Sequence, residues 1–220
     1  KPKIGVLTGI NEQHLALFGS MENLISAEGG IELAECLPQD GAMILNGNNR
    51  VIKSKIKSLP AVATALQAGQ ISKISPLLAG SRQNTGQIKN QIFISIKEKM
   101  DLWAENIKTE KEKISFKVLS KTGESADFSV SVAGIHNVEN IVLATAVSKE
   151  MGMNLEEISK ACLKIKLENG QIEISKNKTG LSVIDSSYSA NPDGVLADLE
   201  YLKLYEGKKI IVMPCLIELG

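Results

Sequence analysis

The chain contains the stretch Gly134-Ile135-His136-Asn137-Val138-Glu139-Asn140-Ile141-Val142-Leu143-Ala144-Thr145-Ala146, around which its other segments can be arranged. Apolar or small side chains recur at the period of an α-helix, at positions 138, 141, 142 and 145. Asn137 is a suitable N-cap, because its side-chain oxygen can accept from a free backbone N–H of the first turn. The stretch therefore predicts a helix that starts at Asn137 and buries one face.

Three polar side chains gather at the start of this helix: His136, Asn137 and Asn140. Two amides and an imidazole at the positive end of a helix can hydrogen-bond a flat heterocycle or approach a phosphate. The same residues also fit a capped core helix, which is the commoner role of such a cap. Taken alone, the stretch favours the core helix, so a binding role depends on other segments.

The composition is typical of a globular protein: 43% of the residues are hydrophobic and 23% are charged. The 25 basic residues balance 25 acidic ones, which argues against a nucleic-acid surface. No apolar run reaches the roughly 20 residues of a membrane-spanning helix. The cysteines, Cys36, Cys162 and Cys215, show no Cys-x-x-Cys spacing, and we expect reduced core residues of a cytoplasmic protein.

The segments before the helix predict a parallel sheet. Residues 3–10 and 42–46 form short apolar runs typical of buried strands, and a helix is predicted over 21–37. The polar loop 11–14 follows the first strand, at the edge where open α/β sheets bind ligands. Residues 47–99 carry no recognisable site.

Weaker patterns predict a helix within 61–78 and strands over 91–96 and 102–107. Residues 113–119 and 127–133 alternate apolar and polar side chains around Lys121-Thr122-Gly123-Glu124, which predicts a β-hairpin leading into Gly134. We expect the central helix to end at Gly152 and a second helix to run from Asn154 to about residue 167.

A second unit is predicted after residue 168. It has strands over 172–175 and 181–185, a helix from Pro192 to about residue 205, and a parallel strand over 209–215. Asn191 is the predicted cap of that helix. Its expected buried residues are Val195, Leu196, Leu199 and Leu202. The result is a β-α-β unit with a polar loop at its switch.

Three segments resemble motifs of the Mur ligase family, ATP-dependent enzymes that add amino acids or peptides to the peptidoglycan precursor. They are His-Asn-x-x-Asn at 136–140, the segment 8–20 with its histidine and Phe-Gly-Ser, and the loop 185–192 followed by Glu-Leu-Gly at 218–220. The last resembles the branch that adds D-alanyl-D-alanine to UDP-N-acetylmuramoyl-tripeptide. The resemblance covers about residues 1–47 and 102–220.

The resemblance implies an α/β fold in two parts. Residues 1–168 are expected to belong to a mostly parallel-sheet, P-loop-type ATPase central domain, and residues 169–220 to begin a Rossmann-like carboxyl-terminal domain. We find no Gly-x-x-Gly-Lys-Thr/Ser phosphate loop, which the family places upstream of the first segment. Because this loop is missing, we expect the fragment to be inactive alone. We also expect the intact protein to be a cytoplasmic monomer that binds no nucleic acid.

In the family, ATP phosphorylates a substrate carboxylate, and the amine of the second substrate attacks the acyl phosphate with help from Mg²⁺. The resemblance assigns His136, Asn137 and Asn140 to the adenine pocket and His14 to the metal. Without the resemblance, an isolated histidine at position 14 favours the other interpretation, a loop histidine that hydrogen-bonds to the backbone. Glu28 or Glu32 takes the place of metal-facing carboxylates that the family builds from a carbamylated lysine and an acidic residue.

The resemblance assigns Asp185, Tyr188 and Asn191 to the nucleotide, across the cleft between the two domains. Departures at Gly9, Gly30, Gln171 and Ser186 remove polar or charged groups that the family normally has. Two alternatives therefore remain open: a folylpolyglutamate or cyanophycin-type ligase of the wider superfamily, and a degenerate relative that binds nucleotide or a partner subunit without ligating.

Overall fold

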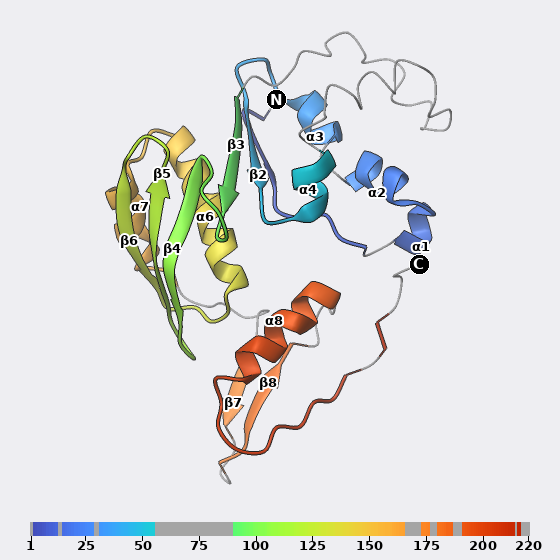
Figure 1. Cartoon of the computed structure of the whole chain (residues 1–220), viewed down its shortest axis with the longest axis vertical. Helices are drawn as coiled ribbons and strands as arrows, with labels where there is room; N and C mark the ends of the chain where they lie inside the picture. Colours follow the sequence, from blue (N-terminus) through green and yellow to red (C-terminus); the bar gives the residue numbers. More distant parts are fainter. Residues whose placement is uncertain are drawn as a thin grey trace.

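The computed structural model describes residues 2–12, 15–28, 31–55, 90–165, 173–176, 180–186, 191–213 and 215–216. These residues form a six-stranded sheet with helices on both faces, and a two-stranded sheet with one helix (Figure 1). The α/β class is confirmed, with a mixed, mostly parallel main sheet. The helix expected within 61–78 lies outside the described residues.

The six strands follow one another across the sheet in chain order: β1 (Ile4–Leu7), β2 (Ala42–Asn46), β3 (Asn90–Ser95), β4 (Leu102–Thr109), β5 (Ile114–Ser120) and β6 (Ser125–Val130). Neighbours from β1 to β4 are parallel, and β4 to β6 form an antiparallel meander. The carboxyl ends of β1, β2 and β3 therefore meet at one edge, the usual ligand edge of such sheets.

Strand β2 is buried on both faces, which explains its unbroken apolar run. Met43 and Leu45 face a cluster that includes residues of α2 (Met21–Glu28) and α4 (Arg50–Lys55). Ile44 faces the opposite cluster, beneath α6 (His136–Glu150). The sheet is thus the middle of three layers, with α6 crossing one face (Figure 1).

The single helix predicted over 21–37 is wrong. The chain forms α1 (Leu15–Phe18), then α2, and then a separate α3 (Ile31–Cys36). Gly29 and Gly30 stand between α2 and α3, and each costs a helix interior about 1 kcal/mol relative to alanine.

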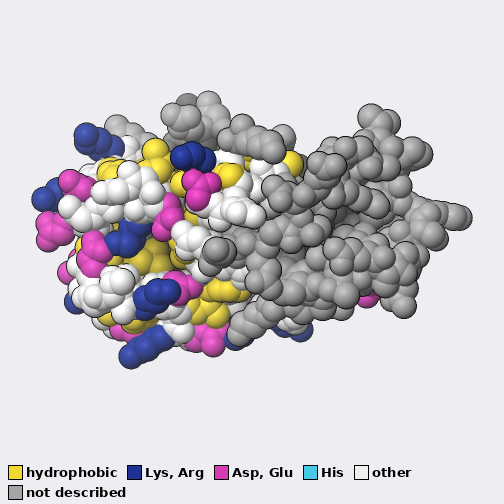
Figure 2. All heavy atoms as spheres, turned by 90° about the horizontal axis from the view of Figure 1, so that it is seen from above, with side chains coloured by type: hydrophobic (Ala, Val, Ile, Leu, Met, Phe, Trp, Pro, Cys, Tyr) yellow, Lys and Arg dark blue, Asp and Glu magenta, His cyan; other side chains and the backbone are white. Residues whose placement is uncertain are grey.

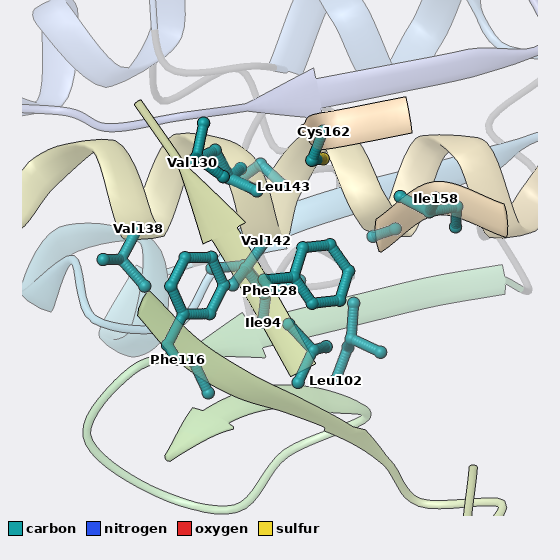
Figure 3. Packing of buried hydrophobic residues seen from close by; sticks show 14 of the residues in the cluster. Ile94, Leu102, Phe116, Phe128, Val130, Val138, Val142, Leu143, Ile158 and Cys162 are labelled. Carbon is teal, nitrogen blue, oxygen red and sulfur yellow. The ribbon is translucent and has the colours of Figure 1, made fainter. Parts of the chain in front are cut away.

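The main core lies between α6, α7 (Leu155–Cys162) and the meander (Figure 3). Phe116 and Phe128 are paired across β5 and β6, and their ring centroids lie 5.4 Å apart in a stacked arrangement. Cys162 is buried in this core, whereas Cys36 and Cys215 are exposed. The expectation of core cysteines is therefore right only for Cys162.

The junction between α6 and α7 is tied to the β5–β6 turn by the carboxylate of Glu124. It accepts a hydrogen bond from the Leu155 N–H at 2.5 Å and pairs with the ammonium of Lys149. Gly152 turns the chain with φ +94°, and Asn154 caps α7 in a capping box with Glu157. The backbone bond from Leu155, followed by Lys149, lowers the pKa of Glu124 below its ordinary value of 4.5.

Glu124→Gln is expected to lower the free energy of unfolding at pH 7 by about 1–2 kcal/mol, because the backbone N–H and the ammonium lose their charged partner. Since the folded pKa is the lower one, this stabilisation is fully present above pH 4.5, and it is lost as the pH falls from 4.5 through the lower folded pKa. Urea titrations from pH 7 to 3 should show the two proteins converging. A difference in unfolding free energy between the two proteins that stays the same at every pH would contradict this role of Glu124.

The second unit contains an antiparallel pair, β7 (Glu173–Lys176) and β8 (Ser182–Asp185), and α8 (Pro192–Leu202). Asn191 caps α8 as predicted, accepting from the Gly194 N–H at 2.9 Å. The predicted burial on this helix is wrong in part, because Leu196 is 62% exposed and Tyr201 is the residue that becomes buried.

The parallel strand predicted over 209–215 is also wrong. Residues 208–213 form no strand, and Val212 is 93% exposed. An apolar run becomes a strand only when a neighbouring strand completes its hydrogen bonds and another layer covers it. Neither is present beside this run within the described part of the chain.

On the face seen in Figure 2, basic and acidic side chains of the described residues are interspersed, and neither sign dominates. This agrees with the balance of 25 basic and 25 acidic residues. Among the described residues, no helix has both the length and the apolar character needed to cross a membrane.

Candidate functional site

A buried amide, a half-buried amide and a buried hydroxyl connect the carboxyl ends of the first three strands. Asn46, the last residue of β2, donates to the Thr8 carbonyl after β1 at 2.9 Å and accepts from the Asn48 N–H at 3.0 Å. Asn48 Oδ1 accepts from the Ser95 hydroxyl at the end of β3 at 2.7 Å. Asn46 and Ser95 are almost fully buried, so this edge is a built polar structure rather than a loose surface.

The first turn of α6 joins the same network through Glu139. Its two carboxylate oxygens accept from Asn46 Nδ2 at 3.0 Å and from Asn48 Nδ2 at 3.1 Å. The helix that carries His136 and Asn140 is therefore anchored at the edge where β1, β2 and β3 end.

His136 is half-buried, and its imidazole lies against the backbone of Gly134. A Cβ placed on Gly134 would come within 2.5 Å of His136 Cε1 and 2.9 Å of Nδ1, and Gly134 also has φ +86°. Only glycine meets both conditions without strain. His136 Nδ1 is buried and has no hydrogen-bond partner among the described residues, which leaves one polar atom of this ring unsatisfied.

Burial lowers the pKa of His136 below its ordinary value of 6.5, and the carboxylates of Asp198 and Glu139 oppose this shift. The ring is therefore mainly neutral at pH 7. A neutral imidazole carries one donor and one acceptor, which is suited to the edge of a heterocycle.

The lowered pKa makes stability depend on pH. The unfolded chain takes up a proton near pH 6.5 while the folded ring resists it, so stability falls as the pH falls through 6.5. Between pH 7 and 5.5 the unsubstituted protein should lose more unfolding free energy than His136→Gln, by at most about 1.4 kcal/mol per pH unit. Urea titrations at a series of pH values measure the unfolding free energy of both proteins. If that free energy changes equally with pH in both, the expectation is contradicted.

The two amides of the motif have different environments. Asn137 is buried and donates to the Ala133 carbonyl at 2.6 Å. It is not the N-cap, because α6 begins at His136 and Ile135 is its N-cap, and among the described residues no side chain caps the helix. The helix starts earlier than predicted because Gly134 already turns the backbone. Asn140 is exposed one turn after His136, so these two share a helix face.

The second unit contacts the first beside this helix. Tyr201 of α8 donates to the Lys111 carbonyl in the β4–β5 turn at 2.6 Å, and the Lys111 ammonium lies 4.9 Å from the Tyr205 ring centroid. Asp198 of α8 is near enough to affect His136 electrostatically. Figure 1 shows α8 lying below the main sheet, and a surface hollow bordered by residues 110–113, Ser131 and Leu204 marks the junction.

The remaining predicted nucleotide residues are placed only in part. Asp185 is exposed at the end of β8, and Asn191 caps α8. Tyr188 lies outside the described residues. Their role toward a nucleotide stays a prediction.

The predicted metal residues stay a prediction as well. His14 lies outside the described residues, and the side chains of Glu28, which ends α2, and Glu32, in the first turn of α3, are not described. Within the described ranges no three His, Cys, Asp or Glu side chains form a group that could hold a metal.

Sequence reasoning missed Asn48 and Ser95 because it assigned nothing to residues 47–99, and it treated Asn46 only as the end of a strand. A signal was present: Asn46-Gly47-Asn48-Asn49 is a polar run directly after a buried strand, at the ligand edge of the sheet. Ser95 gave no such signal, since only the pairing of β2 with β3 brings it to Asn48.

The family profile described as the Mur ligase middle domain matches residues 1–148. UDP-N-acetylmuramoyl-tripeptide–D-alanyl-D-alanine ligase of Mycobacterium tuberculosis is 27% identical over 202 residues, covering 91% of this chain and 34% of the relative. UDP-N-acetylmuramate–L-alanine ligase of Endomicrobium trichonymphae is 27% identical over 212 residues, covering 96% of this chain and 40% of the relative.

Solved structures show the same fold. A crystal structure of MurF from Acinetobacter baumannii superposes with a TM-score of 0.76 at 21% identity, over all of this chain and 41% of that one. MurF from Thermotoga maritima in complex with ADP has a TM-score of 0.68 at 16% identity, over 94% of this chain and 40% of that one. The chain thus spans between 34% and 41% of the length of these relatives.

Proposed function

The chain belongs to the Mur ligase family, and on this premise we propose that the intact protein is an ATP-dependent ligase of peptidoglycan precursor synthesis. In the proposed reaction, the terminal carboxylate of UDP-N-acetylmuramoyl-tripeptide attacks the γ-phosphorus of ATP, giving an acyl phosphate and ADP. The amine of D-alanyl-D-alanine then attacks the acyl carbon, and phosphate leaves as the amide bond forms.

One observation carries the proposal: the first turn of α6 lies at the edge where three parallel strands end, and it presents His136 there. The buried Nδ1, which has no hydrogen-bond partner in the described part of the chain, and the close fit of the ring to Gly134 are suited to a flat heterocycle that stacks or hydrogen-bonds beside them. The adenine of ATP is such a heterocycle.

We assign different tasks to the residues of the proposed adenine site. His136 and exposed Asn140 contact the base, since they share a face one turn apart. Asn137 holds the Ala133 carbonyl and so supports the turn at Gly134. Asp185, Tyr188 and Asn191 approach the nucleotide from the second unit, which already contacts the first at Tyr201.

Magnesium is proposed at the opposite end of the nucleotide, with His14, Glu28 and Glu32 as its candidate protein ligands. Carboxylate oxygens are the ligands that Mg²⁺ prefers, and the two glutamates lie four residues apart in sequence. The metal, when bound, neutralises charge that develops on the transferred phosphoryl group.

The choice of substrate rests on the motif at 185–192 and on Glu-Leu-Gly at 218–220. Relatives that carry different printed substrates are equally similar to this chain, at 27% identity each, so overall identity does not select one. The proposed D-alanyl-D-alanine addition is therefore the point that most needs a direct test.

The test is a ligation assay on the full-length protein with ATP, Mg²⁺ and paired substrates. We expect ADP release and amide formation with UDP-N-acetylmuramoyl-tripeptide and D-alanyl-D-alanine. We expect no turnover with UDP-N-acetylmuramate and L-alanine, or with folate and glutamate. His136→Ala should raise the KM for ATP about tenfold or more, as expected for lost contacts to a bound base.

Other outcomes of this assay have definite meanings. Turnover only with another substrate pair would replace the proposed substrate and keep the ligase. ADP binding without turnover on any pair would favour a degenerate nucleotide-binding relative, which the departures at Glu28, Gln171 and Ser186 also motivate.

A further inference from the structure

The carboxylate of Glu139 links the end of β2 and the loop that follows it to the first turn of α6. Its Oε2 accepts from Asn46 Nδ2 at 3.0 Å and its Oε1 accepts from Asn48 Nδ2 at 3.1 Å. Asn46 is only 4% exposed, so its amide needs protein partners. The residues joined in this way are 93 and 91 positions apart in sequence.

Each amide is also fixed from its other side. Asn46 donates to Thr8 O and accepts from the Asn48 N–H, and Asn48 Oδ1 accepts from Ser95 Oγ and from the Ile96 N–H at 3.2 Å. The carboxylate therefore touches a network that includes the ends of β1, β2 and β3. A buried network in which every member is satisfied rigidifies the groups it joins.

The orientation of the amides excludes a cation at this position. Both carboxylate oxygens face N–H donors, whereas a cation would need oxygen ligands turned toward it. The arrangement instead resembles a clamp between a loop and a helix.

We propose that Glu139 is a positioning residue for the adenine site: by holding Asn46 and Asn48 it fixes the first turn of α6, and so aims His136 and Asn140 at the base. This inference rests on the adenine-binding role proposed above. Glu139 needs no contact with the nucleotide, because an error of about 1 Å in the supporting turn is enough to weaken a site.

Exchanging the carboxylate of Glu139 and the amide of Asn48 can remove these hydrogen bonds and then restore them. In Glu139→Gln one carboxylate oxygen becomes an NH₂ group, which faces the NH₂ of Asn46 or Asn48. In Asn48→Asp/Glu139→Gln that new NH₂ can donate to the new carboxylate, which keeps an oxygen for Ser95 and Ile96. The double variant has the same net charge as the unsubstituted protein.

Glu150→Gln is the matched control. Glu150 is the last residue of the same helix, and its carboxylate also accepts from an asparagine amide, that of Asn90, at 2.9 Å. It lies at the opposite end of α6, so the chemical change is the same and only its distance from the proposed site differs.

The test measures ADP affinity and ligation kinetics of the full-length protein. Glu139→Gln should weaken ADP binding and raise the KM for ATP about tenfold, which corresponds to one lost hydrogen bond to a charged group. Its kcat and the KM values of the other substrates should stay within about twofold, because the reacting phosphate is remote from the base. The double variant should recover to within about threefold of the unsubstituted affinity, and Glu150→Gln should not change it.

Several results would overturn the inference. One is an ADP affinity that does not change in Glu139→Gln. Another is a loss of ADP affinity in Glu150→Gln as large as the loss in Glu139→Gln. A third is a folded double variant whose ADP affinity is no higher than that of Glu139→Gln. A fall in kcat with unchanged KM would indicate lost active protein rather than a displaced site, and would also overturn it. If Glu139→Gln does not fold, Asn48→Ala removes one of the two amides and carries the same expectation.

The proposed function and this inference fail in different ways. No ADP binding by the unsubstituted protein would refute the adenine site and the inference with it. ADP binding without ligation would refute only the proposed reaction, and the affinities of the variants would still decide the role of Glu139.

Discussion

Replacing Phe128 by alanine is expected to lower the free energy of unfolding by about 3–5 kcal/mol. The side chain is 1% exposed and stacks on Phe116 in the core under α6 and α7 (Figure 3). Truncation removes buried apolar surface and leaves a cavity that neighbouring strands cannot fill without moving. The measurement is urea denaturation followed by fluorescence or circular dichroism.

Two variants control this expectation. Leu17→Ala removes a side chain that is 72% exposed, and should change stability by less than about 0.5 kcal/mol. Phe128→Leu keeps more of the volume and should cost less than the alanine variant, which provides a folded comparison if that variant does not accumulate. A loss below about 1 kcal/mol in Phe128→Ala would show that this core is not packed as described.

Gly134→Ala is expected to have the second large effect. The added Cβ would meet the His136 ring at 2.5 Å, in a backbone conformation with φ +86° that other residues adopt at a cost of about 1–3 kcal/mol. Displacing the ring adds an overpacking cost of about 1–3 kcal/mol. The variant should therefore lose stability and, in the full-length protein, affinity for ADP.

Gly123→Ala separates these two costs. Gly123 has φ +88°, and no atom of the described residues lies within 4 Å of the position where its Cβ would be. It should show the backbone cost alone, without the ring contact. In a His136→Ala background, Gly134→Ala should cost no more than Gly123→Ala does, because the ring is gone. If Gly134→Ala and Gly123→Ala lower the unfolding free energy equally when His136 is present, the close fit of Gly134 to His136 is contradicted.

Periodicity and turn chemistry were enough to predict most elements. The strands that became β2 and β5, the helix that became α6, the start of α7 at Asn154 and the cap of α8 at Asn191 all depend on neighbouring residues. Their apolar faces and caps are therefore readable in the sequence itself.

The predictions from the sequence were wrong where the structure of an element depends on contacts with residues distant in the chain. The apolar run predicted as a strand over 209–215 finds no adjacent strand or covering layer among the described residues, so residues 209–213 form no strand and stay exposed. On α8, contact with Lys111 buries Tyr201 in preference to Leu196. Neither outcome can be derived from helix or strand propensity.

The sequence by itself determined the α/β class, the order of the main elements and the motif residues at the start of α6, because local spacing encodes helix and strand faces. Only the tertiary structure decided that Asn46, Asn48 and Ser95 meet Glu139, and that His136 lies against Gly134. Parallel pairing brings the ends of separate strands to one edge, and the packing of α6 on this sheet joins residues more than 90 positions apart through hydrogen bonds that no local pattern records.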